Sequence, residues 1–276
     1  MVERGQVVSD CCKWCEASPV GFSCSNCQLV KYCNQDCQRQ DWKKHKPRCK
    51  EEQARRKGLS KDLWLASCRG DVRAMNELAA QGADINYVWV EHDCNTPLMA
   101  AVTMARFATI DALIVAGVRV HDVDALGFSA LCTACQFGND KDSRDQARQA
   151  GMTSESTSLR MVNALIAAGA NVHQVTTSSG SSPLTLASEH DHPSVVDALI
   201  KAGANVHYAR PDGTTALTTA SLFGHVETVR LLLAADVDPR ISDQSVRTAL
   251  AMATQFNHTA VVALLEARLA ELTGSG

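Results

Sequence analysis

The sequence predicts a mostly α-helical protein, in which a small metal-stabilised module precedes an α-solenoid of about six helix–turn–helix units. Three observations lead to this prediction. Eight of the twelve cysteines fall between Cys11 and Cys49. A short phrase recurs along the remainder of the chain, mostly at intervals of 33 residues. The formal charge changes sign, from +6 over residues 11–57 (eleven Lys/Arg, five Asp/Glu) to −8 over residues 58–276 (fifteen against 23).

The start of the chain disfavours disulfides as the reason for the cysteine cluster. MVERGQVVSD has neither an apolar core nor a small-residue cleavage site, so we expect no secretory signal. No run approaches the roughly 18 apolar residues of a membrane span. We therefore expect an intracellular protein, cytoplasmic or nuclear, in a reducing environment where dense cysteines bind metal or catalyse reactions.

The spacing of the cysteines is that of a metal site. Two or three residues separate the members of four ligand pairs, which are Cys12 with Cys15, Cys24 with Cys27, Cys33 with Cys37, and His45 with Cys49. Two pairs complete one tetrahedral ion, and seven thiolates with one imidazole favour zinc. The sequence thus predicts two Zn²⁺ ions with no position left for water, so their role is structural. Cys11 is an alternative first ligand, because its spacing to Cys15 is also permitted.

The phrases CCKWC, CSNC and LVKYCNQDCQRQDWKKHKPRC resemble the MYND-type zinc finger along nearly the whole of residues 11–49. The resemblance implies that the ligand pairs interleave, with Cys12, Cys15, Cys33 and Cys37 on one ion and Cys24, Cys27, His45 and Cys49 on the other. It also implies a protein-interaction module, since several MYND fingers bind short proline-rich peptides. At the peptide-contacting positions of that family this chain has Ser25, Gln38 and Trp42.

Residues 34–46 are expected to form a short helix that Pro47 ends, because proline cannot continue the hydrogen-bond ladder. On that helix Gln38 and Trp42 are four residues apart and share a face. An aromatic ring with an amide suits a polyproline-type peptide, which is preformed and loses little entropy on docking. The alternative is that Trp42 packs over the zinc core.

The recurring phrase reads NTPLMAA, FSALCTA, SSPLTLA, TTALTTA and RTALAMA, with its Thr or Ser at Thr96, Ser129, Ser182, Thr215 and Thr248. The intervals are 33, 53, 33 and 33 residues. A second phrase, such as GADIN or GANVH, trails each of the first units. A period of 33 residues is typical of ankyrin repeats, and residues 60–270 resemble that family.

The chemistry of the phrases predicts a pair of helices in each unit. Thr or Ser caps the first helix, small alanines let two helices approach, and glycine ends the second helix in a left-handed turn. Each unit leaves an apolar face that its neighbour covers. We expect six units over residues 60–276, after a charged connector at residues 50–59 whose stretch KEEQARRK, Lys50 to Lys57, is helical.

The 53-residue interval contains an insertion of twenty residues, around residues 139–158. Its sequence, NDKDSRDQARQAGMTSESTS, is polar and nearly free of large apolar side chains. We expect a surface loop or a disordered segment here. A functional lid is the alternative.

Two further groups of residues are interpreted as structural. Cys132 and Cys135 copy half a zinc site, but no second pair is in register, so we expect core thiols. Histidines recur at two positions of the repeats. The ankyrin resemblance implies that the histidines before the second helices orient the backbone. The histidines at the repeat turns belong to neighbouring units, which stack about 8–10 Å apart, and this distance is too long for two of them to share a metal ion. The first set is His192, His225 and His258, and the second is His121, His173 and His207.

These features predict an adaptor that binds other proteins and catalyses no reaction. The finger would bind short, proline-rich peptides and the solenoid a second protein. The chain contains no phosphate-binding loop, nucleophile elbow or zinc-protease motif. The basic phrases KKHKPR and RRK give an alternative, a nuclear or transcriptional regulator that contacts nucleic acid through the finger. Seven thiolates and two zinc ions add −7 + 4 = −3, which lowers the +6 of the module to +3 and argues against nucleic acid.

Overall fold

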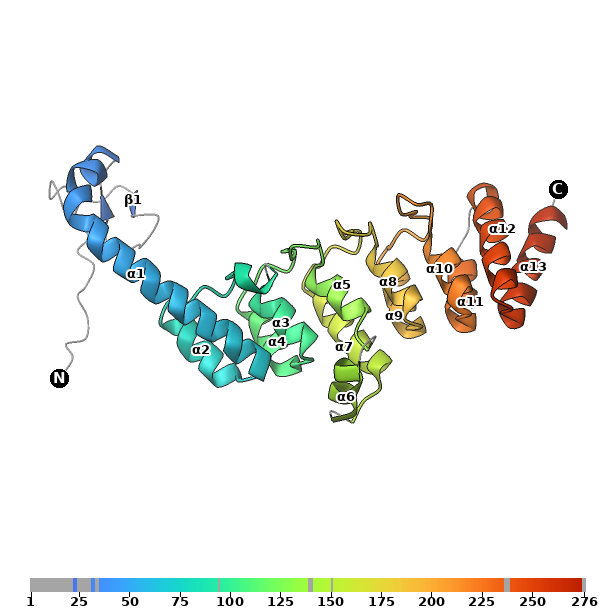
Figure 1. Ribbon diagram of the computed structural model, residues 1–276, viewed down its shortest axis with the longest axis horizontal. Coiled ribbons are helices and arrows are strands. Elements are labelled where there is room, and N and C mark those ends of the chain that lie inside the picture. Colours follow the sequence, from blue (N-terminus) through green and yellow to red (C-terminus); the bar gives the residue numbers. More distant parts are fainter. Residues whose placement is uncertain are drawn as a thin grey trace. The chain divides into compact units, whose positions relative to one another are not determined.

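The computed structural model describes residues 22–23, 31–32, 35–93, 95–138, 141–149, 151–235 and 239–274. They belong to two compact units. The N-terminal unit comprises Met1–Leu63 with Asn76–Asp84, and the C-terminal unit comprises Trp64–Met75 with Ile85–Gly276. The described chain is mostly helical, as predicted (Figure 1).

A two-stranded sheet and a long helix form the N-terminal unit. β1 (Phe22–Ser23) pairs antiparallel with β2 (Lys31–Tyr32), and Phe22 lies opposite Tyr32. α1 (Gln35–Arg69) begins in this unit, and its last residues belong to the C-terminal unit.

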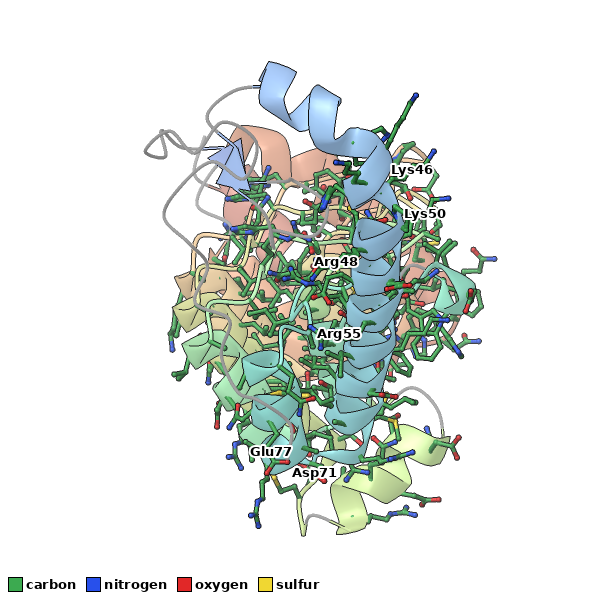
Figure 2. The ribbon with its side chains drawn as sticks, turned by 90° about the vertical axis from the view of Figure 1, so that its left-hand side faces the viewer. Lys46, Arg48, Lys50, Arg55, Asp71 and Glu77 are labelled. Carbon is green, nitrogen blue, oxygen red and sulfur yellow. The ribbon has the colours of Figure 1, made fainter. Side chains whose placement is uncertain are left out.

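The expectation that Pro47 ends the first helix is wrong, because Pro47 lies inside α1. A proline within a helix costs about 3 kcal/mol and produces a kink. α1 bends near Lys46 and then continues (Figure 2). α1 buries side chains on both sides of the proline. His45 precedes Pro47, Cys49 follows it, and Leu63 lies further along the helix. This burial favours a continuous helix, in which the connector at residues 50–59 is helical, as expected, but forms part of α1.

Helix pairs build the C-terminal unit, as predicted. The chain turns at Gly70 from the end of α1 into α2 (Val72–Ala80). After α2, whose residues from Asn76 on belong to the N-terminal unit, the described residues contain five pairs of helices in contact. They are α3 (Pro97–Thr103) with α4 (Phe107–Val115), α5 (Ala130–Cys135) with α7 (Ser154–Ala167), α8 (Pro183–Glu189) with α9 (Pro193–Lys201), α10 (Ala216–Phe223) with α11 (Val226–Ala235), and α12 (Pro239–Gln255) with α13 (Thr259–Gly274).

The repeated Thr or Ser caps the first helix in four units, which confirms the capping prediction. Each hydroxyl accepts a hydrogen bond from the backbone N–H three residues later, at 3.2–3.3 Å. A side-chain cap of this kind stabilises a helix by about 1 kcal/mol. The four residues are Thr96, Ser129, Ser182 and Thr215.

The last repeat departs from this prediction. Thr248 lies in the middle of α12, and its hydroxyl donates to the backbone carbonyl of Gln244 at 2.9 Å. Val246, Ala249 and Ala253 of α12 are fully buried. Since α12 packs against α10 and α13, its start is set by this packing and not by a threonine cap.

Equivalent leucines of successive repeats form the core of the C-terminal unit. Leu131 and Leu184 of the first helices, and Leu165 and Leu199 of the second helices, are at most 1 % exposed. Cys132 and Cys135 are 0 % exposed on α5, which confirms the prediction of core thiols. Burial raises the pKa of both thiols, so they stay protonated and unreactive.

Two of the three histidines that precede the second helices hydrogen-bond to the backbone of the preceding repeat, in line with the expected role in orienting the backbone. Nε2 of His225 donates to the backbone carbonyl of Glu189 at 3.1 Å, and Nε2 of His258 donates to that of Leu222 at 2.9 Å. The third, His192, is 3 % exposed, and its Nδ1 is buried without a hydrogen-bond partner.

The expectation that residues 139–158 form a loop or a disordered segment is wrong. The described part of this insertion contains α6 (Lys141–Gln149) and the start of α7. Thr153 and Ser156 form a capping box. Ser158 is fully buried and donates to the backbone carbonyl of Ala134 at 2.6 Å. Small hydroxyl residues can be buried when they are hydrogen-bonded, so low apolar content was a poor guide to disorder here.

No helix in the described residues is long and apolar enough to cross a membrane.

Candidate functional site

α1 brings two of the predicted zinc ligands together. His45 is 5 % exposed and Cys49 is 1 % exposed. On a helix, side chains four residues apart are neighbours, with Cβ atoms about 5–6 Å apart. A nitrogen and a sulfur donor buried on one face, at this spacing, fit the two bonds that a tetrahedral zinc ion takes from one ligand pair.

The side chains of the other predicted zinc ligands, and of two of the predicted peptide contacts, lie outside the described residues. Cys37 and Gln38 lie on the first turn of α1, but their side chains fall outside the described part. Six residues lie outside the described residues altogether, namely Cys12, Cys15, Cys24, Ser25, Cys27 and Cys33. Among the described residues, no three His, Cys, Asp or Glu side chains are grouped so that they could hold a metal.

Trp42 lies one helical turn before Lys46, at the edge of the face that buries His45. Its indole is 36 % exposed, and its ring centroid is 6.0 Å from that of His45, at 56° between planes. The ring therefore contacts His45, a predicted zinc ligand, and also presents surface to the solvent.

Most of the outer surface of α1 near this ring is basic. Lys46 and Lys50 project from one side of the helix and Arg48 and Arg55 from the other (Figure 2). On the next turns Arg55 and Arg56 each approach Glu52 to 2.8 Å, so a single carboxylate offsets part of their positive charge. The hydrogen bond from Arg55, with a smaller one from Arg56, lowers the pKa of Glu52 to about 2.

A second candidate surface lies at the turns that precede the first helices of the C-terminal unit (Figure 1). Isolated bridges close these hairpins, for example Trp89 with Asn95 and Val123 with Ser129. Val90 is 73 % exposed and Leu126 is 53 % exposed at their tips.

An aromatic cluster supports the first of these hairpins. Trp64 and Trp89 meet edge to face with ring centroids 4.8 Å apart, and His92 lies 4.5 Å from Trp89 and 5.3 Å from Trp64. The indole N–H of Trp89 donates to the carboxylate of Glu91 at 2.9 Å. These contacts hold a rigid, partly exposed aromatic surface at the tip.

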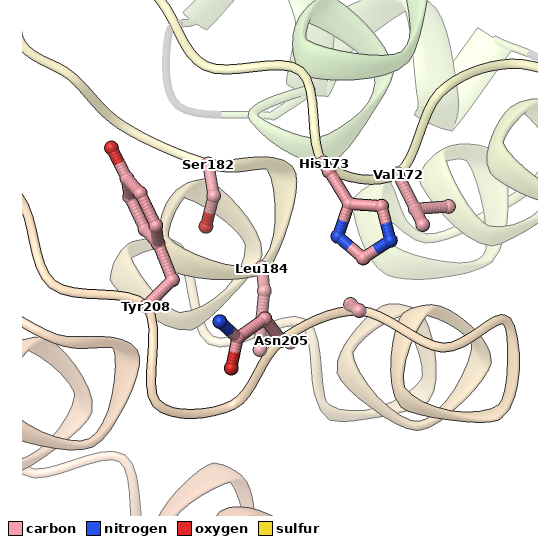
Figure 3. A pocket seen from close by; sticks show the side chains of 7 residues that line it. Val172, His173, Ser182, Leu184, Asn205 and Tyr208 are labelled. Carbon is pink, nitrogen blue, oxygen red and sulfur yellow. The ribbon is translucent and has the colours of Figure 1, made fainter.

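A small pocket opens between two later turns (Figure 3). Its volume is about 140 Å³. Small-molecule sites usually measure about 300–1,000 Å³, so this pocket suits one side chain of a partner. The lining residues are Val172, His173, Ser182, Leu184, Ala204, Asn205 and Tyr208.

Comparison with protein families agrees with this architecture. Residues 12–49 match the family of the MYND finger, and residues 151–243 and 205–273 match ankyrin repeats in three copies. The chain carries a MYND finger followed by ankyrin repeats. No curated protein was found to match it in sequence. The matched range of the MYND finger begins at Cys12 and ends at Cys49, the first and last of the predicted ligands.

The MYND finger implies zinc binding, and both kinds of module are interaction domains. Sequence reasoning missed one feature of the finger. Because the helix was expected to stop at Pro47, the lysines on either side of the proline were treated as a general basic patch. The four-residue spacing of Lys46 and Lys50 would have placed them on one face of a continuous helix.

Proposed function

We propose that this protein is an adaptor that joins two protein partners and catalyses no reaction. In this proposal the MYND finger holds two structural zinc ions and binds a short, proline-rich peptide, while the ankyrin repeats bind a second protein. Cys12, Cys15, Cys33 and Cys37 would hold one ion, and Cys24, Cys27, His45 and Cys49 the other. A closed set of thiolate and imidazole ligands supplies folding energy that about forty residues cannot obtain from a hydrophobic core.

The observation that carries the proposal is the position of Trp42. A tryptophan that served only as core would be covered, yet this ring is 36 % exposed while its neighbour His45 is buried. Exposed aromatic rings on a rigid helix are typical anchors for proline-rich segments. Ser25 and Gln38 would complete the peptide-binding surface.

The ankyrin repeats offer surface of a different kind. Val90, Val123 and Leu126 expose apolar side chains at successive hairpin tips, where a partner could cover them. Backbone hydrogen bonds join these hairpins to their neighbours, from the N–H of Ala125 to the carbonyl of Asp93 at 2.9 Å and from the N–H of Thr177 to the carbonyl of Leu126 at 3.0 Å.

The proposal is tested by Trp42→Ala in the full-length, zinc-loaded protein. We expect loss of binding to a proline-rich peptide library by at least about thirtyfold, because losing an aromatic anchor costs about 2 kcal/mol or more. Zinc content should stay at two ions per chain. Affinity is measured by titration and zinc by metal analysis of the same samples.

Two results would contradict this function. Unchanged peptide binding in the Trp42→Ala protein would show that the ring is not the anchor. Loss of zinc in the variant would show that Trp42 acts as core instead.

A further inference from the structure

Four exposed lysines form a row along α1, beginning beside Trp42. They are Lys43, Lys46, Lys50 and Lys57. At 3.6 residues per turn these positions fall within about 60° of arc, and Trp42 lies about 40° from Lys46. None of the four makes an ion pair with the part of the chain that the structure describes.

Within the basic surface of α1, these four lysines form a line along one side of the helix. Arg55 and Arg56 are paired with Glu52, and Arg55 lies on the opposite side of the helix from Lys46 and Lys50. Glu51 is exposed beside the row and limits its width. A narrow line of unpaired cations fits one extended anionic chain, whereas a nucleic-acid duplex presents phosphates on two strands and needs a broader positive face.

From this geometry we infer that the partner of the finger is a proline-rich peptide that continues into an acidic segment, and that the lysine row binds the acidic segment. The inference rests on the function proposed above, since it extends the peptide site that begins at Trp42. Because the exposed ring of Trp42 adjoins the lysine row, one peptide can contact both. The positive charge of the row favours acidic residues in the part of the peptide that lies along it.

The spacing of the row predicts where the acidic residues lie. At 1.5 Å per residue, the path along the axis of α1 from Trp42, followed through the bend near Lys46, is about 6, 12 and 22 Å long to Lys46, Lys50 and Lys57. A polyproline-type chain advances about 3.1 Å per residue. Glutamates or aspartates are therefore expected about two, four and seven residues from the peptide residue that docks on Trp42, on one side of the proline-rich core.

The test uses the full-length, zinc-loaded protein and synthetic peptides built on one proline-rich core whose binding depends on Trp42. Glutamate is placed at the three predicted positions, either before or after the core, and glutamine at the same positions serves as control. We expect one of the two glutamate peptides to bind about tenfold tighter than its glutamine control, because three exposed ion pairs contribute modestly each. The advantage should shrink at high salt.

Two substitutions of matched charge locate the effect on the helix. Lys50→Gln should reduce the advantage of the glutamate peptide about twofold while leaving the glutamine peptide unchanged. Arg48→Gln removes an equally exposed cation two residues away, on the opposite side of α1, and should change neither.

Several outcomes would overturn the inference. Equal affinity of the glutamate and glutamine peptides, or equal effects of Lys50→Gln and Arg48→Gln, would show that the row does not bind the peptide. Tighter binding of a random DNA duplex than of the glutamate peptide, weakened by Lys50→Gln, would assign the row to nucleic acid. If the core binds through Trp42 but flanking charge has no effect, only this inference fails; if no proline-rich core binds, the proposed function fails with it.

Discussion

At the scale of single residues, His192 shows how one buried ring can make the stability of the repeats depend on pH. The ring is 3 % exposed, and Nδ1 lacks a hydrogen-bond partner. Burial first, and then the neighbouring His190, lowers the pKa of His192 to about 4, while the carboxylates of Glu155 and Asp191 oppose the shift. Nothing near the ring compensates a positive charge well enough to keep it in the folded state.

We expect the protein to lose stability as the pH falls from about 6.5 towards 4. The folded-state pKa lies below the unfolded value of about 6.5, so folding favours the neutral ring, and its contribution is complete above pH 6.5. The loss attributable to this residue is about 3 kcal/mol at most. Urea unfolding of the wild type and of His192→Gln at pH 7.5, 6 and 4.5 would measure it. Parallel pH profiles for the two proteins would contradict the assignment.

At the scale of the elements, close packing between neighbouring repeats limits which side chains fit at the turns. Gly224 ends α10 with φ of 77°, and a Cβ there would lie 2.5 Å from Nδ1 of His258. His258 cannot move away without giving up its hydrogen bond to Leu222. Gly203 has a similar φ of 88°, but a Cβ there would meet nothing within 4 Å.

These two glycines therefore form a matched pair. Gly203→Ala should cost about 1 kcal/mol of unfolding free energy, from backbone strain alone. Gly224→Ala should cost about 1–2 kcal/mol more, because it also displaces the cross-repeat histidine. Urea unfolding monitored by circular dichroism measures both. Equal losses would show that the contact with His258 has no energetic weight.

The insertion supports a second prediction at this scale. Because Ser158 donates to the carbonyl of Ala134 in the core, Ser158→Ala should remove one of the hydrogen bonds of that carbonyl and cost about 1 kcal/mol. Ser178→Ala, at an exposed position, should change stability by less than about 0.5 kcal/mol. The same unfolding assay compares them. An unchanged unfolding free energy in the Ser158→Ala variant would show that this hydrogen bond does not stabilise the packing of the insertion.

At the scale of the whole molecule, the sequence was informative where local chemistry or repetition decides the structure. The caps at Thr96 and Ser182 and the fold of paired helices could be predicted from a repeated phrase, because each unit meets the same neighbours. The helix through Pro47, the helices of the insertion and the position of Thr248 within α12 could not. Each depends on what the segment packs against, and that is not contained in the segment itself. The side chains of most predicted zinc ligands lie outside the described residues, so their assignment stays a prediction.

The last prediction concerns the dependence of the two modules on metal. If two zinc ions hold the finger, a strong chelator should release both and unfold the start of α1, because an isolated helix is marginally stable without packing. The helices of the later repeats should persist, since their core of leucines such as Leu184 and Leu199 contains no predicted ligand. Hydrogen exchange would show lost protection around His45 and Cys49 with unchanged protection in α8 to α11. Cys49→Ser should lose one ion, whereas Cys68→Ser, outside the finger, should keep both. Loss of protection throughout the repeats on chelation would mean that the repeats need the finger to fold, and a metal content below two in the wild type would contradict the ligand assignment.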